Sequence, residues 1–377
     1  MSAEHAGRLA RAQAAMGGAG LDALLLTTEA DIRWATGFLT RFWESPTRPW
    51  FLVVPARGAS VAVIPSIGVP LMEAAAVGEV RSWASPDPAD DGVSLLAGTL
   101  ADLVPSGGQI GVPSGGGTHL RMPLADWDRL RAALPDRRFG SDGGAMERLR
   151  MMKSEAEIAL IRETCAVAGR AFARLPEIAR AGAALPEVFR RFQMLLLEEG
   201  ADWVPYLAGA AGPGGYGDVI APATDRALSR GDVLMLDTGA IRAGAFCDFD
   251  RNFAVGAPSG EGAEAHARLV EATRAGLAAA RPGATAADLF EAMARVTGAG
   301  AGAGRLGHGL GLQLTEPPSL IPADRTVFAP GMVLTLEPSL RLGDGRLMVH
   351  EEDVVIREDG AEWLTDPAGP EMPVLAG

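Results

Sequence analysis

Five residues of this chain combine the side-chain types of a metal centre with positions that are unusual for charged groups. Asp237 and Glu337 each follow an apolar run, Asp248 and Glu352 lie inside strand-like segments, and His308 lies between glycines in GHGLGL. A carboxylate on a buried strand is costly unless it is paired or bound to a metal ion. Lysine and arginine are few near these positions. The set therefore predicts an oxygen-rich site for divalent cations.

Each acid taken alone also fits an ordinary residue at a strand end, either solvated or capping a turn. The four acids, however, occur in two matched segments. Asp237 and Glu337 are 100 residues apart, and Asp248 and Glu352 are 104 residues apart. We therefore predict an internal duplication, in which two hairpins place their acids around one pseudo-twofold centre.

The elements that must position these residues follow the same duplicated order of two helices and a hairpin. Ser154 with Glu157 three residues later has the spacing of a capping box, so a helix is predicted to begin there. Helices are predicted over 154–173, 184–199, 262–280 and 285–297, and strands over 232–237, 245–255, 332–338 and 346–356.

The first part of the chain has a different order of helical and strand-like segments, which predicts a separate α/β domain. An amphipathic stretch at 6–16 precedes short aliphatic runs that alternate with helical stretches. The polar, glycine-rich run FGSDGGA at 139–145 is interpreted as a linker. Because 377 residues exceed the roughly 250 to 300 that one core usually supports, we predict domains over 1–140 and 141–377. Strands of the first domain are predicted over 22–27, 50–55, 60–65 and 78–84.

Composition and charge exclude several classes of partner. The net charge of −13, with no cluster of Lys and Arg, argues against nucleic acid. No run reaches ~18 apolar residues, and the first residues lack the apolar core of a signal peptide, so we expect a cytoplasmic protein without a membrane partner. Two cysteines, Cys165 and Cys247, are too few for a disulfide framework.

These motifs resemble those of the pita-bread metallopeptidases: aminopeptidase P, prolidase, methionine aminopeptidase and their metal-free relative creatinase. DTGAIRAGAFCDFDRNF is similar to the family's D-x-G segment followed by D-x-T-R-T-F, and GHGLGLQLTEPP to GHGxGxxxHEPP. GMVLTLEP resembles GMVxTxEPG, and HEEDVVIREDG resembles R-x-E-D-x-V-x-V-T-E-D-G. The resemblance implies a creatinase-type α/β domain over 1–140 and an α+β pita-bread domain with internal pseudo-twofold duplication over 141–377.

The resemblance also implies a role for each of the five residues. Asp237, Asp248, His308, Glu337 and Glu352 would bind two divalent ions per chain, from among Mn(II), Fe(II), Co(II) and Zn(II). Two such ions share a hydroxide nucleophile and polarise a carbonyl, and Glu337 would take the proton from the bridging water. A homodimer is implied as well.

Four positions depart from the family pattern. Thr315 and Ile220 replace two histidines that line the substrate site in the peptidases. Asp250 shares a strand face with Asp248 and is either a partner of Arg251 or the backbone, or a sixth carboxylate touching metal or substrate. His350, two residues before Glu352, is either a replacement proton shuttle or a structural residue. The other histidines, His5, His119 and His266, are expected in terminal, loop and helix-surface positions.

The function predicted from these residues is metal-dependent hydrolysis of an amide C–N bond in a short peptide or small molecule, as in an Xaa-Pro peptidase or an amidohydrolase. Loss of the two histidines leaves two alternatives open. One is a lyase or hydrolase of a small zwitterion that keeps the metals, and the other is an inactive binding homologue.

Overall fold

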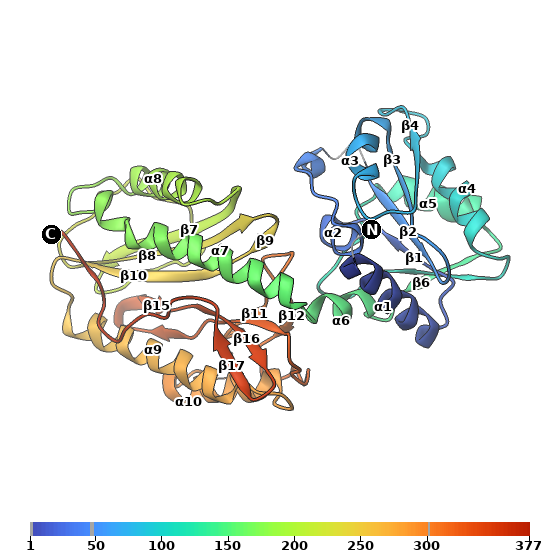
Figure 1. Cartoon of the computed structure of the whole chain (residues 1–377). Helices are drawn as coiled ribbons and strands as arrows, with labels where there is room; N and C mark the ends of the chain where they lie inside the picture. Colours follow the sequence, from blue (N-terminus) through green and yellow to red (C-terminus); the bar gives the residue numbers. More distant parts are fainter. Residues whose placement is uncertain (1–2, 46–48, 301) are drawn as a thin grey trace. The chain divides into compact units, whose positions relative to one another are not determined.

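The computed structural model describes residues 3–45, 49–300 and 302–377, and the chain divides after Arg150 into two compact units. The N-terminal unit is built on a mixed six-stranded sheet in the order β4-β3-β2-β1-β5-β6 (Figure 1). Its strands are β1 (Ala23–Leu26), β2 (Phe51–Pro55), β3 (Val61–Pro65), β4 (Glu79–Trp83), β5 (Gln109–Val112) and β6 (Arg138–Ser141). Its helices are α1 (Ala3–Ala19), α2 (Glu29–Thr36), α3 (Val69–Glu73), α4 (Val93–Leu103), α5 (Leu124–Ala133) and α6 (Ala145–Met151). The continuous apolar runs form the buried strands β1, β2 and β3, as predicted.

The predicted linker at 139–145 is largely regular structure, and the units divide after residue 150 rather than after 140. β6 pairs in parallel with β5, so the start of this run is an edge of the N-terminal sheet. The Asp142 carboxylate then accepts hydrogen bonds from the backbone N–H of Gly144 and Met146, which starts α6. Arg150 at the end of α6 pairs with buried Asp31 at 2.9 Å. These contacts attach the segment to the N-terminal unit.

The C-terminal unit contains two main sheets, in the orders β18-β10-β8-β7 and β12-β11-β13-β16-β17. Their strands pair antiparallel, as is common in an α+β fold, except that β18 pairs with β10 in parallel. The first consists of β7 (Trp203–Pro213), β8 (Asp232–Arg242), β10 (Phe249–Val255) and β18 (Val374–Leu375), with β9 (Ala245–Phe246) paired to β8. The second consists of β11 (His308–Gly309), β12 (Glu316–Ser319), β13 (Val333–Leu336), β16 (Glu352–Arg357) and β17 (Gly360–Trp363). A separate ribbon pairs β14 (Ser339–Arg341) with β15 (Leu347–Val349).

Two helices accompany each sheet, which is the duplicated order expected from the sequence. They are α7 (Glu155–Ala173) and α8 (Leu185–Glu198), then α9 (Gly260–Ala279) and α10 (Ala286–Thr297). Figure 1 shows α7 and α8 along the first sheet and α9 and α10 beside the second. The capping box of Ser154 and Glu157 is present, and α10 begins with another one, made by Thr285 and Asp288.

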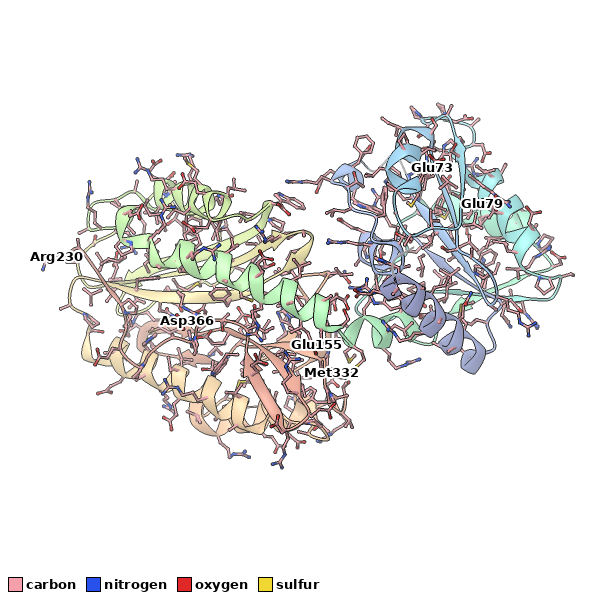
Figure 2. The ribbon with its side chains drawn as sticks, in the orientation of Figure 1. Glu73, Glu79, Glu155, Arg230, Met332 and Asp366 are labelled. Atoms are coloured by element: carbon pink, nitrogen blue, oxygen red, sulfur yellow. The ribbon has the colours of Figure 1, made fainter. Side chains whose placement is uncertain are left out.

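Contacts far apart in the sequence join α7 to the second sheet. Glu155, in the first turn of α7 (Figure 2), accepts a hydrogen bond from Arg357 of β16 at 2.7 Å. The core under the first sheet packs Phe172 and Phe192 at a ring distance of 4.7 Å. Cys165 and Cys247 are buried in the same core as free thiols. In the described part of the chain, no helix is long and apolar enough to cross a membrane.

Candidate metal centre

The first hairpin brings Asp237 of β8 opposite Asp250 of β10, so their side chains lie on one face of the sheet. Tyr206 of the neighbouring strand β7 donates a hydrogen bond to Asp237 Oδ2 at 3.0 Å. Burial and then the nearby Asp250 carboxylate raise the pKa of Asp237 well above its ordinary value. Two acids held side by side in this way need a compensating charge.

Three side chains from separate segments form a compact cluster with metal-ligand character. Asp248 lies between β9 and β10, His308 begins β11, and Glu351 directly precedes β16. One ligand atom from each lies within 4.8 Å of the others, and all three residues are buried. Burial and the neighbouring carboxylates raise the pKa of Asp248 and of Glu351. A divalent cation would offset this repulsion directly.

His308 is oriented for ligation by its backbone and by the glycines around it. Its Nδ1 lies 2.8 Å from the Gly309 carbonyl oxygen, so Nδ1–H donates there and Nε2 is left with a free lone pair. That Nε2 lies 3.4 Å from Asp248 Oδ2. Burial, followed by the charge of Arg305, lowers the pKa of His308 to about 4, so the ring is neutral at pH 7. A Cβ on Gly307 would lie 2.2 Å from the Thr335 carbonyl, which explains why glycine precedes the histidine.

The structure does not bring Glu352, the ligand expected from the sequence, into this cluster. Its Oε2 accepts hydrogen bonds from Arg251 at 2.9 Å and from the Thr365 hydroxyl, and its Oε1 accepts one from the Ala368 N–H at 2.8 Å. Burial alone would raise the pKa of Glu352, but Arg251 and the hydrogen bonds hold it at about 2. Successive residues of an extended chain face opposite sides, so Glu351 takes the position facing Asp248 and His308.

Glu337 follows β13 directly and faces the same group of acids. Burial raises the pKa of Glu337 to about 7. The Arg305 guanidinium acts to lower this pKa, and the Asp250 carboxylate acts to raise it further. Without a bound cation, this buried carboxyl group therefore takes up a proton near neutral pH.

The unpaired atoms of these residues fit a cation. Among the described residues, Asp237 Oδ1, Glu351 Oε1 and both Asp250 oxygens are buried without a hydrogen-bond donor. Buried carboxylate oxygens without donors are costly, and carboxylates with one imidazole are ordinary ligands of divalent first-row metals. The donor set therefore matches a metal centre.

His350 lies behind this centre and is fully buried. Its Nδ1 is 3.4 Å from Asp250 Oδ1 and its Nε2 is 3.1 Å from Glu352 Oε1. Burial opposes the charged form, but these two carboxylates raise the pKa of His350. The Arg251 side chain pairs with Glu352 and not with the Asp250 carboxylate. His266, expected on a helix surface, is buried instead, and its ring lies 5.9 Å from that of His350.

The two positions that replace the family histidines differ in their surroundings. Ile220 is 75% exposed, and its backbone N–H donates to Asp218. Thr315 is half-buried and accepts a long contact of 3.5 Å from Arg305. Neither side chain carries a group that exchanges protons near pH 7.

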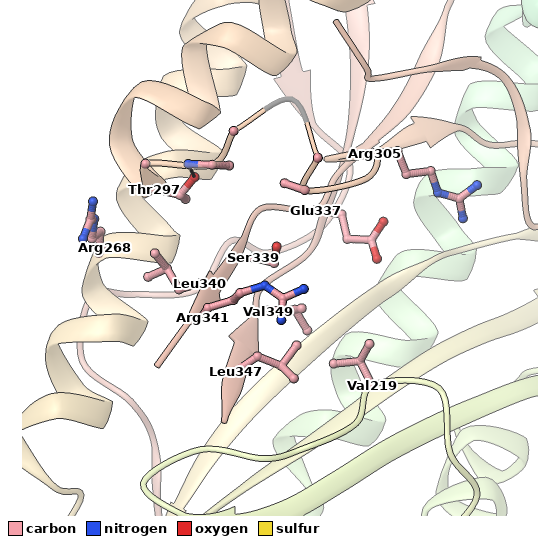
Figure 3. Close-up of a pocket in the computed structure, with 15 residues that line it drawn as sticks. Val219, Arg268, Thr297, Arg305, Glu337, Ser339, Leu340, Arg341, Leu347 and Val349 are labelled. Atoms are coloured by element: carbon pink, nitrogen blue, oxygen red, sulfur yellow. Dashed lines mark hydrogen bonds between the residues drawn. The ribbon is translucent and has the colours of Figure 1, made fainter. Parts of the chain in front are cut away.

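A cavity of about 650 Å³ adjoins the centre at Glu337 (Figure 3). Figure 3 shows Glu337, Arg305 and Arg341 around it, together with apolar side chains. Val349, which precedes Glu351 by two residues, lines this cavity, whereas His350 does not. A small molecule or a short peptide fits a space of this size.

Three of these residues were not predicted from the sequence. The Glu-Glu doublet at 351 and 352 offered two equivalent candidates, and only packing separates them. Tyr206 lies on β7, a strand whose pattern LAGAAG is too poor in β-branched residues to signal a strand. Arg305, three residues before His308, could have been found from its place in the histidine segment.

Comparison with known proteins places this geometry among peptidases. Residues 159–358 match the family described as metallopeptidase family M24, and residues 8–152 match the creatinase/prolidase N-terminal domain. The probable dipeptidase PepE of Mycobacterium tuberculosis is 32% identical over 369 residues, covering 95% of this chain and 93% of that protein.

Solved structures agree with this placement. The crystal structure of dipeptidase PepE from Mycobacterium ulcerans superposes with a TM-score of 0.84 at 29% identity, covering 100% of this chain and 99% of that one. X-Pro aminopeptidase from Thermotoga maritima superposes with a TM-score of 0.81 at 25% identity, covering 97% of this chain and 99% of that one. Both the fold and the two-domain order are thereby confirmed.

Proposed function

This chain belongs to metallopeptidase family M24, and we propose that it is a peptidase of very short peptides whose centre holds two divalent ions. Membership of the family makes it a metal-dependent peptidase, so the non-peptidase and inactive alternatives are not favoured. The observation that carries the two-ion proposal is the cluster of Asp248, His308 and Glu351 beside Asp237 and Glu337, with buried carboxylate oxygens that lack donors. Mn, Co, Fe and Zn all suit this donor set.

The proposed ligands are Asp237, Asp248, His308, Glu337 and Glu351, with Glu351 in place of the Glu352 expected from the sequence. When bound, two such ions activate a water molecule and polarise the scissile carbonyl. Glu337 is proposed to accept the proton of that water, because its carboxylate lies beside the other proposed ligands and also lines the cavity.

The remaining residues hold these groups in position. Tyr206 orients Asp237 through its hydroxyl, and the Gly309 carbonyl orients the His308 ring. His350 is proposed to compensate the charge of Asp250 and Glu352, because its buried ring contacts both and does not line the cavity. This favours the structural alternative for His350 over a proton shuttle.

The substrate class is proposed from the size of the cavity and from the relatives. A space of about 650 Å³ suits a dipeptide or a similar small molecule, and relatives named dipeptidase and X-Pro aminopeptidase share the fold. Hydrolysis of a proline-containing dipeptide is therefore the first activity to assay. The homodimer and the cytoplasmic location stay predictions.

The deciding experiment is reconstitution of metal-free protein with each ion, followed by measurement of bound metal and of dipeptide hydrolysis. Near two ions per chain with cleavage of Xaa-Pro or other dipeptides is expected. A chain that binds no ion, or that binds two and cleaves no peptide, contradicts the proposal.

A further inference from the structure

Lys153 forms a buried ion pair with the segment that follows His308. Its Nζ lies 3.1 Å from Glu316 Oε2, and each of the two side chains is only 3% exposed. Glu316 begins β12, and its register partner on β11 is Gly309, the residue after His308. A lysine and a glutamate at this depth are costly unless they pair with each other. The pair therefore joins the first residues of the C-terminal unit to the strand beside the proposed ligand.

The other carboxylate oxygen of Glu316 closes the loop between β11 and β12. This Oε1 accepts hydrogen bonds from the backbone N–H of Leu312 at 3.1 Å and of Gln313 at 3.2 Å. Gly311 leaves the space that the pair occupies, since a Cβ there would lie 2.9 Å from Lys153 Cε and 3.0 Å from Glu316 Oε2. One carboxylate thus binds the loop with one oxygen and the lysine with the other, so the ion pair fixes the position of the loop.

The position of this loop bears on the direction of the His308 ring. β11 consists of His308 and Gly309 alone, and its register with β12 shifts between these two residues. Because a register shift interrupts the ladder of hydrogen bonds, the loop contacts must help to hold these peptide groups. The Gly309 carbonyl accepts the Nδ1–H of His308 at 2.8 Å, so the direction of this carbonyl sets the direction in which Nε2 points.

Lys153 also contacts the segment that leads to Glu337. Its backbone N–H donates to the Gly331 carbonyl at 3.0 Å. Gly331 has a φ of 91°, and a Cβ there would lie 2.8 Å from the Lys153 carbonyl oxygen, so this close approach needs glycine. β13 begins two residues later at Val333, and Glu337 directly follows its last residue. One lysine therefore contacts, with its side chain and its backbone, the two segments that carry His308 and Glu337.

We propose that Lys153 is a positioning residue of the metal centre, which holds the His308 ring in its ligating direction through the ion pair with Glu316. This inference rests on the proposed function, because it assumes that His308 is a ligand. Lys153 does not line the cavity, so it acts through Glu316 and the loop. An ion pair that only stabilised the fold would affect the free energy of unfolding and leave the imidazole unchanged.

The test compares Lys153→Met with Arg150→Met, each as metal-free protein and during titration with Mn(II). Met keeps a flexible apolar stem and carries no charge. Arg150→Met is the matched control, because it also breaks a buried ion pair, that of Arg150 with Asp31 at 2.9 Å, but in the N-terminal unit. Histidine-selective NMR of the metal-free proteins reports on the ring, and His308→Ala identifies its signals.

The wild-type His308 signals should be those of a neutral ring with its proton on Nδ1. Lys153→Met should shift these signals or divide them between two tautomers. It should also lower the affinity for Mn(II) by about 10- to 100-fold, as is typical for loss of a group that orients a metal ligand. Arg150→Met should change neither. Wild-type His308 signals and wild-type affinity in Lys153→Met would overturn the inference, and so would equal losses in Arg150→Met.

A second variant keeps the inference falsifiable if Lys153→Met does not fold. Lys153→Met alone leaves a buried charge, whereas Lys153→Met combined with Glu316→Gln removes both charges and keeps an amide oxygen for the N–H groups of the loop. This double variant should fold and still show altered His308 signals and lowered affinity, and wild-type values of both would refute the role. If the wild type binds no metal, the proposed function fails, while the NMR signals of the metal-free proteins still decide whether Lys153 positions the ring.

Discussion

Replacing Glu351 by Gln should abolish binding of metal at full stoichiometry and leave the metal-free fold intact. Glu352→Gln should instead destabilise the metal-free fold and leave metal binding at full stoichiometry. The two residues are adjacent, and both are buried. Only Glu351 contributes to the group with Asp248 and His308, and only Glu352 pairs with Arg251. The pair of variants therefore separates metal ligation from structural charge pairing.

The structure sets the size of the second effect. The pKa of Glu352 falls from 4.5 to about 2, which at roughly 1.4 kcal/mol per pH unit corresponds to about 3 kcal/mol of stability at neutral pH. This contribution is present above the unfolded pKa and is lost as the pH falls through the folded one. For a unit of this size, about 3 kcal/mol lowers Tm by roughly 6 to 12 °C. Glu351 has a raised pKa and an oxygen without a donor, so Gln at 351 should not lower Tm.

The assay combines calorimetric unfolding of the metal-free proteins at pH 7 with titration of Mn(II) or Co(II). Loss of a residue that only orients a metal ligand typically lowers metal affinity by about 10- to 100-fold. Glu351→Gln removes a proposed ligand, so it should lower the affinity for metal by at least that factor. Wild-type metal affinity in Glu351→Gln, together with metal loss and an unchanged Tm in Glu352→Gln, would refute this assignment and restore the one expected from the sequence.

Three further predictions address the centre and its surroundings. His308→Ala should lose bound metal and activity with little change in secondary structure, which metal analysis and circular dichroism check; full activity would contradict a role in the centre. In metal-free protein, Tm should fall as the pH rises from 5.5 to 8.5, because Glu337 and Asp353 titrate at about 7 and about 8 when folded but near 4 when unfolded; a flat or rising Tm contradicts this sign. His350→Ala should lower the Tm measured by calorimetric unfolding, because Asp250 and Glu352 lose the buried ring that compensates their charge. If His350 is instead a proton shuttle, turnover of the metal-loaded variant should fall by ~10² with Tm unchanged.

Local patterns in the sequence predicted part of the regular structure in each of the two units. The apolar runs of β1, β2 and β3, the capping box at Ser154 and the repeated order of two helices and a hairpin all depend on neighbouring residues. Such features are determined by side-chain periodicity and by local hydrogen bonds, which the sequence contains directly. The edge strand β7 has weaker local signals, and β6 overlaps the run at 139–145 that was interpreted as a linker.

The residue types and spacing of Asp237, Asp248, His308 and Glu337 were enough to predict a metal centre before any coordinates were considered. The sequence could not decide between Glu351 and Glu352. A strand turns successive side chains to opposite faces, and a glutamate stands on each face of this doublet. Arg251, more than a hundred positions away in the chain, pairs with Glu352 and leaves Glu351 to the centre. Likewise, the Asp31 contact of Arg150 places the division between the units beyond the predicted linker. Sequence alone thus determined which chemistry the chain carries. The tertiary structure decided which carboxylate faces the proposed metal centre, because long-range charge pairing is absent from any local pattern.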